Sequence, residues 1–221
     1  MDIILLIATL AITLIAQGYI NSKYSETRKI KSLKGLSGKE VAERILRENN
    51  LTNVRVEETR GVLSDHYDPK NKVVRLSPAI YEETSLASIS VASHECGHAI
   101  QDKDNYQFLR FRSSLIPFVN IASTFGYIAI MIGLFAGIFG FIWIGIFMEC
   151  IILLFQLITL PVEFDASNRA LKEIKKLGMV EDKELSKCRG MLTAAALTYV
   201  ASVLTSILQI IRLLGMVNRR D

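Results

Sequence analysis

The sequence predicts an α-rich integral membrane protein in which about four transmembrane helices accompany a small cytoplasmic α+β domain. Three observations lead to this fold class. The chain has 221 residues, of which 50% are hydrophobic, and its mean hydropathy of +0.31 is too high for an ordinary soluble domain. The apolar residues occur in long blocks. Lysines and arginines lie directly beside these blocks, as they do on the cytoplasmic side of membrane proteins.

The first element, residues 1–21, is predicted to be a transmembrane helix. Residues 3–20 are apolar apart from threonines and a glutamine, and this length is enough to cross a bilayer. A cleaved signal peptide would carry a basic segment before its apolar core, and none precedes this one. Basic residues between positions 23 and 34 place the N-terminus outside and the following residues in the cytoplasm.

Residues 22–113 are predicted to form the soluble domain. Ser37 and Glu40 have the spacing of a capping box, which favours a helix beginning at this point. Thr84 or Ser85 can cap a later helix. The elements expected between these helices are a strand at 53–58 and a hairpin of 61–66 with 72–77 around an Asp-Pro-Lys-Asn turn.

Three further segments complete the predicted organisation. Residues 114–161 are almost continuously apolar and twice as long as one spanning helix needs, so they are expected to form a two-helix hairpin with its turn near Gly137. Residues 162–190 are expected to contain a segment that supplies a third metal ligand, followed by a charged, amphipathic linker. Residues 191–221 form the last predicted transmembrane helix and a short tail, with small residues that favour close helix packing.

The candidate metal-binding motif is His94-Glu95-Cys96-Gly97-His98, an HExxH sequence inside an expected helix. Histidines at positions i and i+4 project from one helical face at a spacing that suits one Zn²⁺. Glu95 lies next to the first histidine and can take a proton from water at the metal, as a general base. The chain has only three histidines, and two of them belong to this motif.

A catalytic zinc site normally has three protein ligands and one open position, so a third donor is expected. His66, Glu163 and Asp165 are the candidates. The predicted hairpin returns residue 163 to the membrane side that carries the motif, and Glu163 is therefore preferred. Asp165 is either the ligand itself or an acceptor for the second N–H of a ligand histidine. The alternative is that both carboxylates only cap the following helix.

His66 is expected either to be a surface histidine or to stabilise the oxyanion of the reaction. The strand that precedes the motif helix is expected to be a sheet edge on which an extended peptide substrate can lie. Its predicted substrate-binding residues are Val73, Val74, Arg75 and Leu76. Glu149 lies within an apolar block, and a protonated packing contact is preferred over a catalytic role for it.

Four motifs in order resemble the YugP-like family of integral-membrane neutral zinc metallopeptidases. They are Ser-Asp-His-Tyr-Asp-Pro at 64–69, Val-Val-Arg-Leu-Ser at 73–77, Val-Ala-Ser-His-Glu-Cys-Gly-His-Ala-Ile-Gln at 91–101 and Leu-Pro-Val-Glu-Phe-Asp-Ala-Ser at 160–167. The resemblance covers nearly the whole chain. This family is in turn similar to the gluzincins, in which a downstream glutamate completes HExxH.

The resemblance implies a zincin-like domain with His94, His98 and Glu163 as zinc ligands and Glu95 as the base. One departure concerns position 167. HtpX-type membrane proteases have an aspartate four residues after the ligand glutamate, where this sequence has Ser167. We therefore expect the supporting role to move to Asp165, and the choice between Glu163 and Asp165 as ligand stays open.

The predicted function is a zinc-dependent endopeptidase that cleaves peptide bonds at the cytoplasmic surface of the cell membrane. Its partners are then protein or peptide substrates and the lipid bilayer. Basic tracts interleaved with aromatic residues are absent, so no nucleic-acid partner is expected. The alternative is an inactive zinc-binding membrane scaffold. Proteolysis inside the bilayer is disfavoured because charged, soluble-type segments flank the motif helix.

Overall fold

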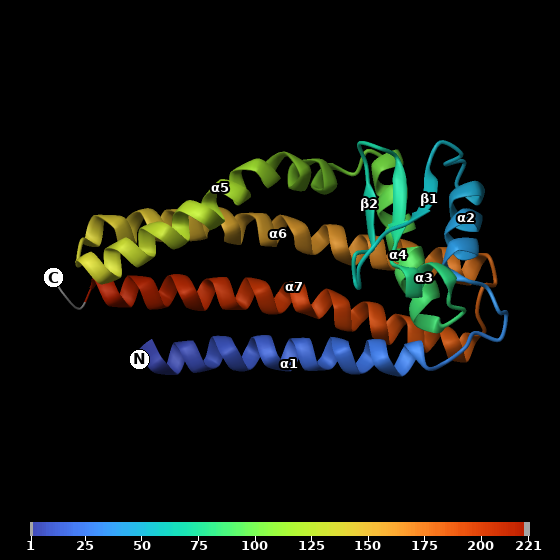
Figure 1. The fold of residues 1–221 in the computed structure, drawn as a ribbon, viewed down its shortest axis with the longest axis horizontal. Coiled ribbons are helices and arrows are strands. Elements are labelled where there is room, and N and C mark those ends of the chain that lie inside the picture. The colour runs from blue at the N-terminus through green and yellow to red at the C-terminus, as the bar shows by residue number, and fades with distance from the viewer. Residues whose placement is uncertain (1, 219–221) are drawn as a thin grey trace. The chain divides into compact units, whose positions relative to one another are not determined.

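The computed structural model describes residues 2–218 and is mostly helical (Figure 1). Four of the described helices are long and apolar enough to cross a membrane: α1 (Asp2–Arg28), α5 (Gln107–Ala136), α6 (Phe139–Lys176) and α7 (Asp182–Val217). The chain divides into two compact units. The prediction of about four spanning helices therefore agrees with the length and composition of the helices.

Among the described residues, the first unit consists of 2–17, 110–161 and 197–218. Within it, Gly137 adopts a φ of +69° in the turn between α5 and α6, where the predicted hairpin has its turn. Glycines also allow close helix contact, because a Cβ on Gly126 would lie 2.8 Å from the Cβ of Met148. Many large apolar side chains on these helices are exposed, as expected for surfaces that face lipid.

The second unit consists of residues 18–109 and 162–196 and contains the remaining elements. Helix α2 (Gly38–Glu48) begins at the predicted capping box, in which Ser37 Oγ accepts from the Glu40 N–H and the Glu40 carboxylate accepts from the Ser37 N–H. Its apolar face packs on α4 (Leu86–Lys103), together with the short helix α3 (Pro78–Glu82). Parts of α6 and α7 complete this hydrophobic core.

A three-stranded sheet in the order β1-β3-β2 belongs to the same unit. Strand β1 (Arg55–Glu58) is parallel to β3 (Val73–Leu76), and β2 (His66–Asp68) is antiparallel to β3. The turn of the β2–β3 hairpin is held by the Asp68 carboxylate, which accepts hydrogen bonds from the backbone N–H groups of Lys70 and Asn71.

One predicted strand differs from the structure, and one predicted linker can be described in more detail. The first hairpin strand is His66–Asp68, and residues 61–65 are a loop, because Gly61 and Leu63 have φ angles of +109° and +56°, which no strand accommodates. The expected linker at 162–190 is helical through most of its length. Helix α6 continues to Lys176 and α7 starts at Asp182, with Gly178 at a φ of +57° in the turn between them.

Candidate metal centre

Helix α4 places His94 and His98 on one face, one turn apart. The helix begins at Ser85, whose Oγ accepts a hydrogen bond of 3.1 Å from the backbone N–H of Ser88. The two imidazole rings lie edge to face with their centroids 4.8 Å apart. His98 is buried and His94 is partly buried. The predicted i and i+4 geometry of the motif is therefore present.

Helix α6 brings the carboxylate of Glu163 to these two rings. Glu163 Oε2 lies 3.2 Å from His94 Nε2 and 3.8 Å from His98 Nε2. The side chain of Glu163 is buried. One possible ligand atom from each of these residues lies within 4.8 Å of the others. The structure thus places Glu163, and not Asp165, with the two histidines.

The close approach of α6 to α4 requires a glycine at the centre of the motif. A Cβ built on Gly97 would lie 2.4 Å from the carbonyl oxygen of Ala166, and this oxygen belongs to the rigid backbone of α6. Any side chain at position 97 would therefore force the two helices apart. Glu163 would then move away from His94 and His98.

The Nδ1 atom of His94 contacts Ser167. The distance from Nδ1 to Ser167 Oγ is 3.2 Å. Ser167 lies one helical turn after Glu163 on α6, so both side chains reach the same imidazole from the same helix face. The expectation that the supporting role moves away from position 167 is therefore wrong for His94.

The Nδ1 atom of His98 contacts Gln101 Oε1 at 3.0 Å. The amide nitrogen of this fully buried glutamine donates to the carbonyl oxygen of Val162 at 2.8 Å and to Asp165 Oδ2 at 2.9 Å. Both of these partners are acceptors, so the amide orientation is fixed and its oxygen must face His98. That oxygen can only accept, and His98 Nδ1 must therefore carry the proton. Nε2, which lies 3.8 Å from Glu163 Oε2, is then the ring nitrogen that faces the carboxylate.

Asp165 is connected to the imidazole of His98 through the side chain of Gln101. Its carboxylate binds Gln101 and also forms an ion pair with Arg169, which in turn pairs with Asp104. Asp165 thus orients Gln101, and Gln101 contacts the imidazole. Gln101 was missed by the sequence analysis, although its position three residues after His98 is a signal that the two side chains are neighbours on the helix.

Glu95 is buried beside this cluster. Burial raises the pKa of its carboxyl to about 7, and the nearby carboxylate of Glu163 adds to this shift. The imidazole of His94 and a hydrogen bond from the backbone N–H of Tyr67 favour the charged form. A divalent cation at the cluster would also favour the carboxylate. Because Tyr67 belongs to strand β2, its backbone N–H holds the Glu95 carboxylate beside the cluster.

His66 is not part of this arrangement. Its exposed ring contacts the carbonyl oxygen of Ser64 at 2.7 Å and the Arg75 guanidinium at 3.4 Å. Arg75 also forms ion pairs with Glu57 and Asp68. These contacts are on the opposite side of β2 from Tyr67, whose hydroxyl donates to Asp102 of α4. The contacts of His66 thus give no support to an oxyanion-stabilising role.

The predicted substrate edge is also wrong. Strand β3 pairs with β1 on one side and with β2 on the other, so its backbone offers no free edge. The side chains of Val73, Val74 and Leu76 are buried, and Arg75 belongs to the ion pairs described above. In the other unit, Glu149 forms a hydrogen bond with Ser206 of α7, which makes it a helix–helix contact.

The donor set fits a small divalent cation. Two imidazole nitrogens and one carboxylate oxygen are the ligands of many catalytic zinc sites, which leave a fourth position open. Each imidazole has an oxygen partner at Nδ1, which is the support that metal-bound histidines usually have. Within residues 2–218, these three side chains are the group of donors close enough to share one ion.

The fold and this cluster define a class: a helical membrane protein with an HExxH helix and a carboxylate from a second helix. The sequence matches, over residues 2–218, a protein family described as "Putative neutral zinc metallopeptidase". The chain belongs to this family. It is 42% identical over 220 residues to the "Putative membrane protease YugP" of Bacillus subtilis (strain 168), covering 99% of this chain and 98% of that protein. No solved structure matches it.

The helix contact at Gly97 generates a first prediction. Gly97→Ala is expected to lower the free energy of unfolding by about 1–3 kcal/mol or more, because the added methyl overpacks a backbone contact. Gly190→Ala is the matched control. A Cβ there meets nothing within 4 Å, and alanine favours a helix by roughly 1 kcal/mol over glycine. Thermal unfolding of both variants in detergent measures the difference. Equal stabilities would contradict the close contact.

The buried amide generates a second prediction. Gln101→Ala is expected to weaken zinc binding by about 10–100-fold, because His98 loses the group that fixes its protonation state. Gln107→Ala removes an exposed glutamine and is the control. Competition with a chromogenic chelator measures zinc affinity in both variants, with thermal unfolding checked in parallel. Wild-type affinity in a folded Gln101→Ala protein would show that Gln101 does not position His98.

Proposed function

We propose that this protein is a zinc-dependent endopeptidase that cleaves peptide bonds at the cytoplasmic surface of the membrane. The observation that carries the proposal is the position of Glu95, a buried carboxylate next to the group of His94, His98 and Glu163. Family membership supports zinc and proteolysis, and the four long apolar helices support a membrane location.

His94, His98 and Glu163 would hold the zinc ion. A bound zinc would supply a Lewis acid that polarises a peptide carbonyl and makes water a stronger acid. Glu95 would accept a proton from the attacking water and donate it to the leaving amine nitrogen. The backbone N–H of Tyr67 holds the Glu95 carboxylate during this exchange. Ser167 and Gln101 keep the two imidazoles in the orientation that the ligands need.

An extended substrate would lie beside β2 and not beside β3. In the described sheet β2 is an edge strand, since β3 is its only partner. The backbone N–H of Tyr67 on this strand contacts Glu95, so the edge of β2 lies beside the proposed base. A peptide added to this edge would gain backbone hydrogen bonds that do not depend on its sequence.

We place the site on the cytoplasmic side for two reasons, the connectivity of the four long helices and the basic residues that follow the apolar part of α1. Helices α1, α6 and α7 each run from the first unit into the second, and α5 starts at their boundary. All four therefore have one end in the unit that contains the site. The basic residues that follow the apolar part of α1 belong to this unit, which favours the cytoplasm.

Cysteine labelling in intact cells tests this orientation. In a Cys150→Ala background, Lys70→Cys is expected to react with an impermeant maleimide only after permeabilisation. Ile138→Cys lies in the turn between α5 and α6 and is expected to react from outside. Labelling of Lys70→Cys in sealed cells, with Ile138→Cys protected, would reverse the proposed topology.

A non-catalytic zinc scaffold is the alternative class of function. Such a protein needs the three ligands but has no use for Glu95. Glu95→Gln keeps both imidazoles and Glu163, so it is expected to retain zinc while activity on a casein-like substrate falls by about 10²–10⁴-fold. Glu163→Gln removes a charged ligand and is expected to lose zinc together with activity. Zinc content and cleavage rate are measured on the same preparations.

Asp165→Asn is the matched carboxylate control, because Asp165 reaches the cluster only through Gln101. Its zinc content is expected to stay above that of Glu163→Gln. If Asp165→Asn loses zinc while Glu163→Gln keeps it, the ligand assignment is wrong. If Glu95→Gln cleaves as fast as the wild type, or the wild type shows no chelator-sensitive cleavage, the scaffold is favoured.

A further inference from the structure

The orientation of Gln101 depends on a carboxylate that is not itself buried. Asp165 Oδ2 accepts the amide N–H of Gln101 at 2.9 Å, and this contact helps to turn the amide oxygen toward His98. The side chain of Asp165 is 32% exposed, whereas Gln101 is fully buried. An aspartate that water reaches has several rotamers available and can exchange its partner for water. A further contact is therefore needed to keep this carboxylate where Gln101 uses it.

The guanidinium of Arg169 supplies that contact. Arg169 Nε lies 2.5 Å from Asp165 Oδ2, the same oxygen that accepts from Gln101. Arg169 follows Asp165 by one helical turn on α6, at the i and i+4 spacing at which opposite charges meet on a helix. A hydrogen bond between two charged groups is stronger than one between neutral groups. Arg169 thus restricts the Asp165 carboxylate to one position.

Two groups at the end of α4 hold Arg169 in turn. Its Nη1 lies 2.5 Å from Oδ2 of Asp104, the C-cap residue of α4. Its guanidinium carbon lies 5.9 Å from the ring centre of Tyr106, which is a cation–π distance. Because the guanidinium is planar, contacts made through Nε and Nη1 together fix its direction. The C-terminal end of a helix also favours a cation. Arg169 therefore has little freedom to move.

These contacts form a continuous path from a partly exposed cation to a histidine of the candidate metal centre. The path runs from Arg169 to Asp165, then to Gln101, and ends at His98 Nδ1. All four residues belong to one compact unit. Groups that support a metal-bound histidine commonly contribute to metal affinity without touching the metal. Arg169 is in a position to contribute in this way.

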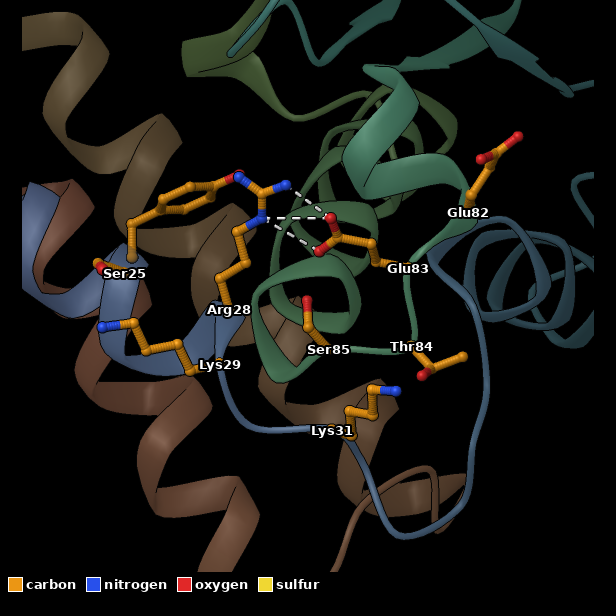
Figure 2. Close-up of a pocket in the computed structure, with 9 residues that line it drawn as sticks. Ser25, Arg28, Lys29, Lys31, Glu82, Glu83, Thr84 and Ser85 are labelled. Atoms are coloured by element: carbon orange, nitrogen blue, oxygen red, sulfur yellow. Dashed lines mark hydrogen bonds and ion pairs between the residues drawn. The ribbon is translucent and has the colours of Figure 1, made fainter.

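A second arginine ion pair near α4 provides a comparison. Arg28 of α1 binds the Glu83 carboxylate, with Nη2 2.6 Å from Oε1 and Nε 3.1 Å from Oε2, and Figure 2 shows this pair beside a cavity of about 730 Å³. Glu83 precedes Ser85, the N-cap residue of α4, so the pair holds the beginning of the helix. From residue 85 to residue 101 the helix rises about 24 Å, at 1.5 Å per residue. The Arg28 pair therefore supports α4 at a distance from Gln101.

We propose that Arg169 is a positioning residue for His98 and acts through Asp165 and Gln101. This inference rests on the proposed role of His98 as a zinc ligand. The positive charge of Arg169 makes the two possible effects opposite in sign. A cation near a metal site repels the metal ion, so charge alone predicts that removal of Arg169 strengthens zinc binding. Positioning of His98 predicts that the same change weakens it.

The zinc affinity of the full-length protein in detergent, measured by competition with a chromogenic chelator, tests this proposal. Arg169→Gln is expected to bind zinc about tenfold more weakly, at the lower end of the effect of groups that support a ligand. Arg28→Gln is the matched control, because it also removes an arginine ion pair beside α4, and it is expected to change the affinity no more than about twofold. Unchanged or tighter zinc binding by Arg169→Gln, or an equal loss in both variants, would overturn the proposal.

A double-variant cycle tests the path itself. In a Gln101→Ala background, Arg169→Gln is expected to change zinc affinity no more than about twofold, because the group on which it acts is gone. A merely structural role would give two additive losses, and additivity would therefore contradict the path. Thermal unfolding of the zinc-free proteins shows whether each variant is folded. If Arg169→Gln does not fold, Arg169→Lys keeps the charge and the aliphatic stem but lacks the planar fork, and the same outcomes apply to it.

The same measurements separate this proposal from the proposed function. Zinc binding is measured without a substrate, so the result for Arg169 stands whether or not the protein cleaves peptides. A wild-type protein that binds no zinc would overturn the ligand assignment and the role of Arg169 together. Normal zinc binding by the wild type and by Arg169→Gln would overturn the role of Arg169 alone.

Discussion

The contact between Gly97 of α4 and the Ala166 carbonyl of α6 is the constraint on which the candidate site depends. Closely packed helices keep a fixed separation, because moving them apart opens a void that costs free energy. Glu163 and Ser167 lie on either side of Ala166 along the same face of α6, and both reach His94. One backbone contact thus sets the position of the carboxylate and of the imidazole support together.

The polar groups around this contact explain why the arrangement is specific. A buried carboxylate or amide costs free energy unless its hydrogen-bonding capacity is used. Gln101 is fully buried, and it uses its oxygen on His98 and its nitrogen on Val162 and Asp165. A shift of α6 would break all three contacts at once. The network therefore stabilises a single relative position of these two helices.

The burial of Glu163 beside two imidazoles also favours a bound cation at the cluster. Its carboxylate is nearly excluded from solvent and faces ring nitrogens whose other sides are already held by Ser167 and Gln101. Such a carboxylate needs positive charge nearby. A divalent cation can supply that charge while binding both histidines, and this is the simplest physical reason for the geometry.

The sequence predicted the local features of this site and missed those that depend on distant pairing. The spacing of His94 and His98, the capping box at Ser37 and the glycine turn at 137 are local patterns, and all three have the expected geometry. The hairpin argument also led to Glu163, because an even number of crossings returns the chain to the same side. The structure brings Glu163 together with His94 and His98, as this argument predicted.

The errors have identifiable causes. Strand β3 was expected at an edge because a strand's own sequence does not show which strands pair with it. Its parallel partner β1 joins it by long-range pairing. Asp165 was expected near a ring because position 167 holds a serine where HtpX-type proteases have an aspartate. Helix α6 in fact continues through this segment, so position 167 and not 165 shares a face with Glu163. The role of Gln101 depends on a contact with α6 that α4 alone does not reveal.

X-ray absorption at the zinc edge of the purified protein tests the central claim most directly. The account predicts stoichiometric zinc with two imidazole nitrogens and oxygen donors at about 2.0–2.2 Å. It predicts no sulfur at about 2.3 Å, because Cys96 is buried in the hydrophobic core. Loss of the imidazole signal in His94→Ala or His98→Ala would support the assignment. A sulfur ligand, or a protein that binds no zinc, would contradict it.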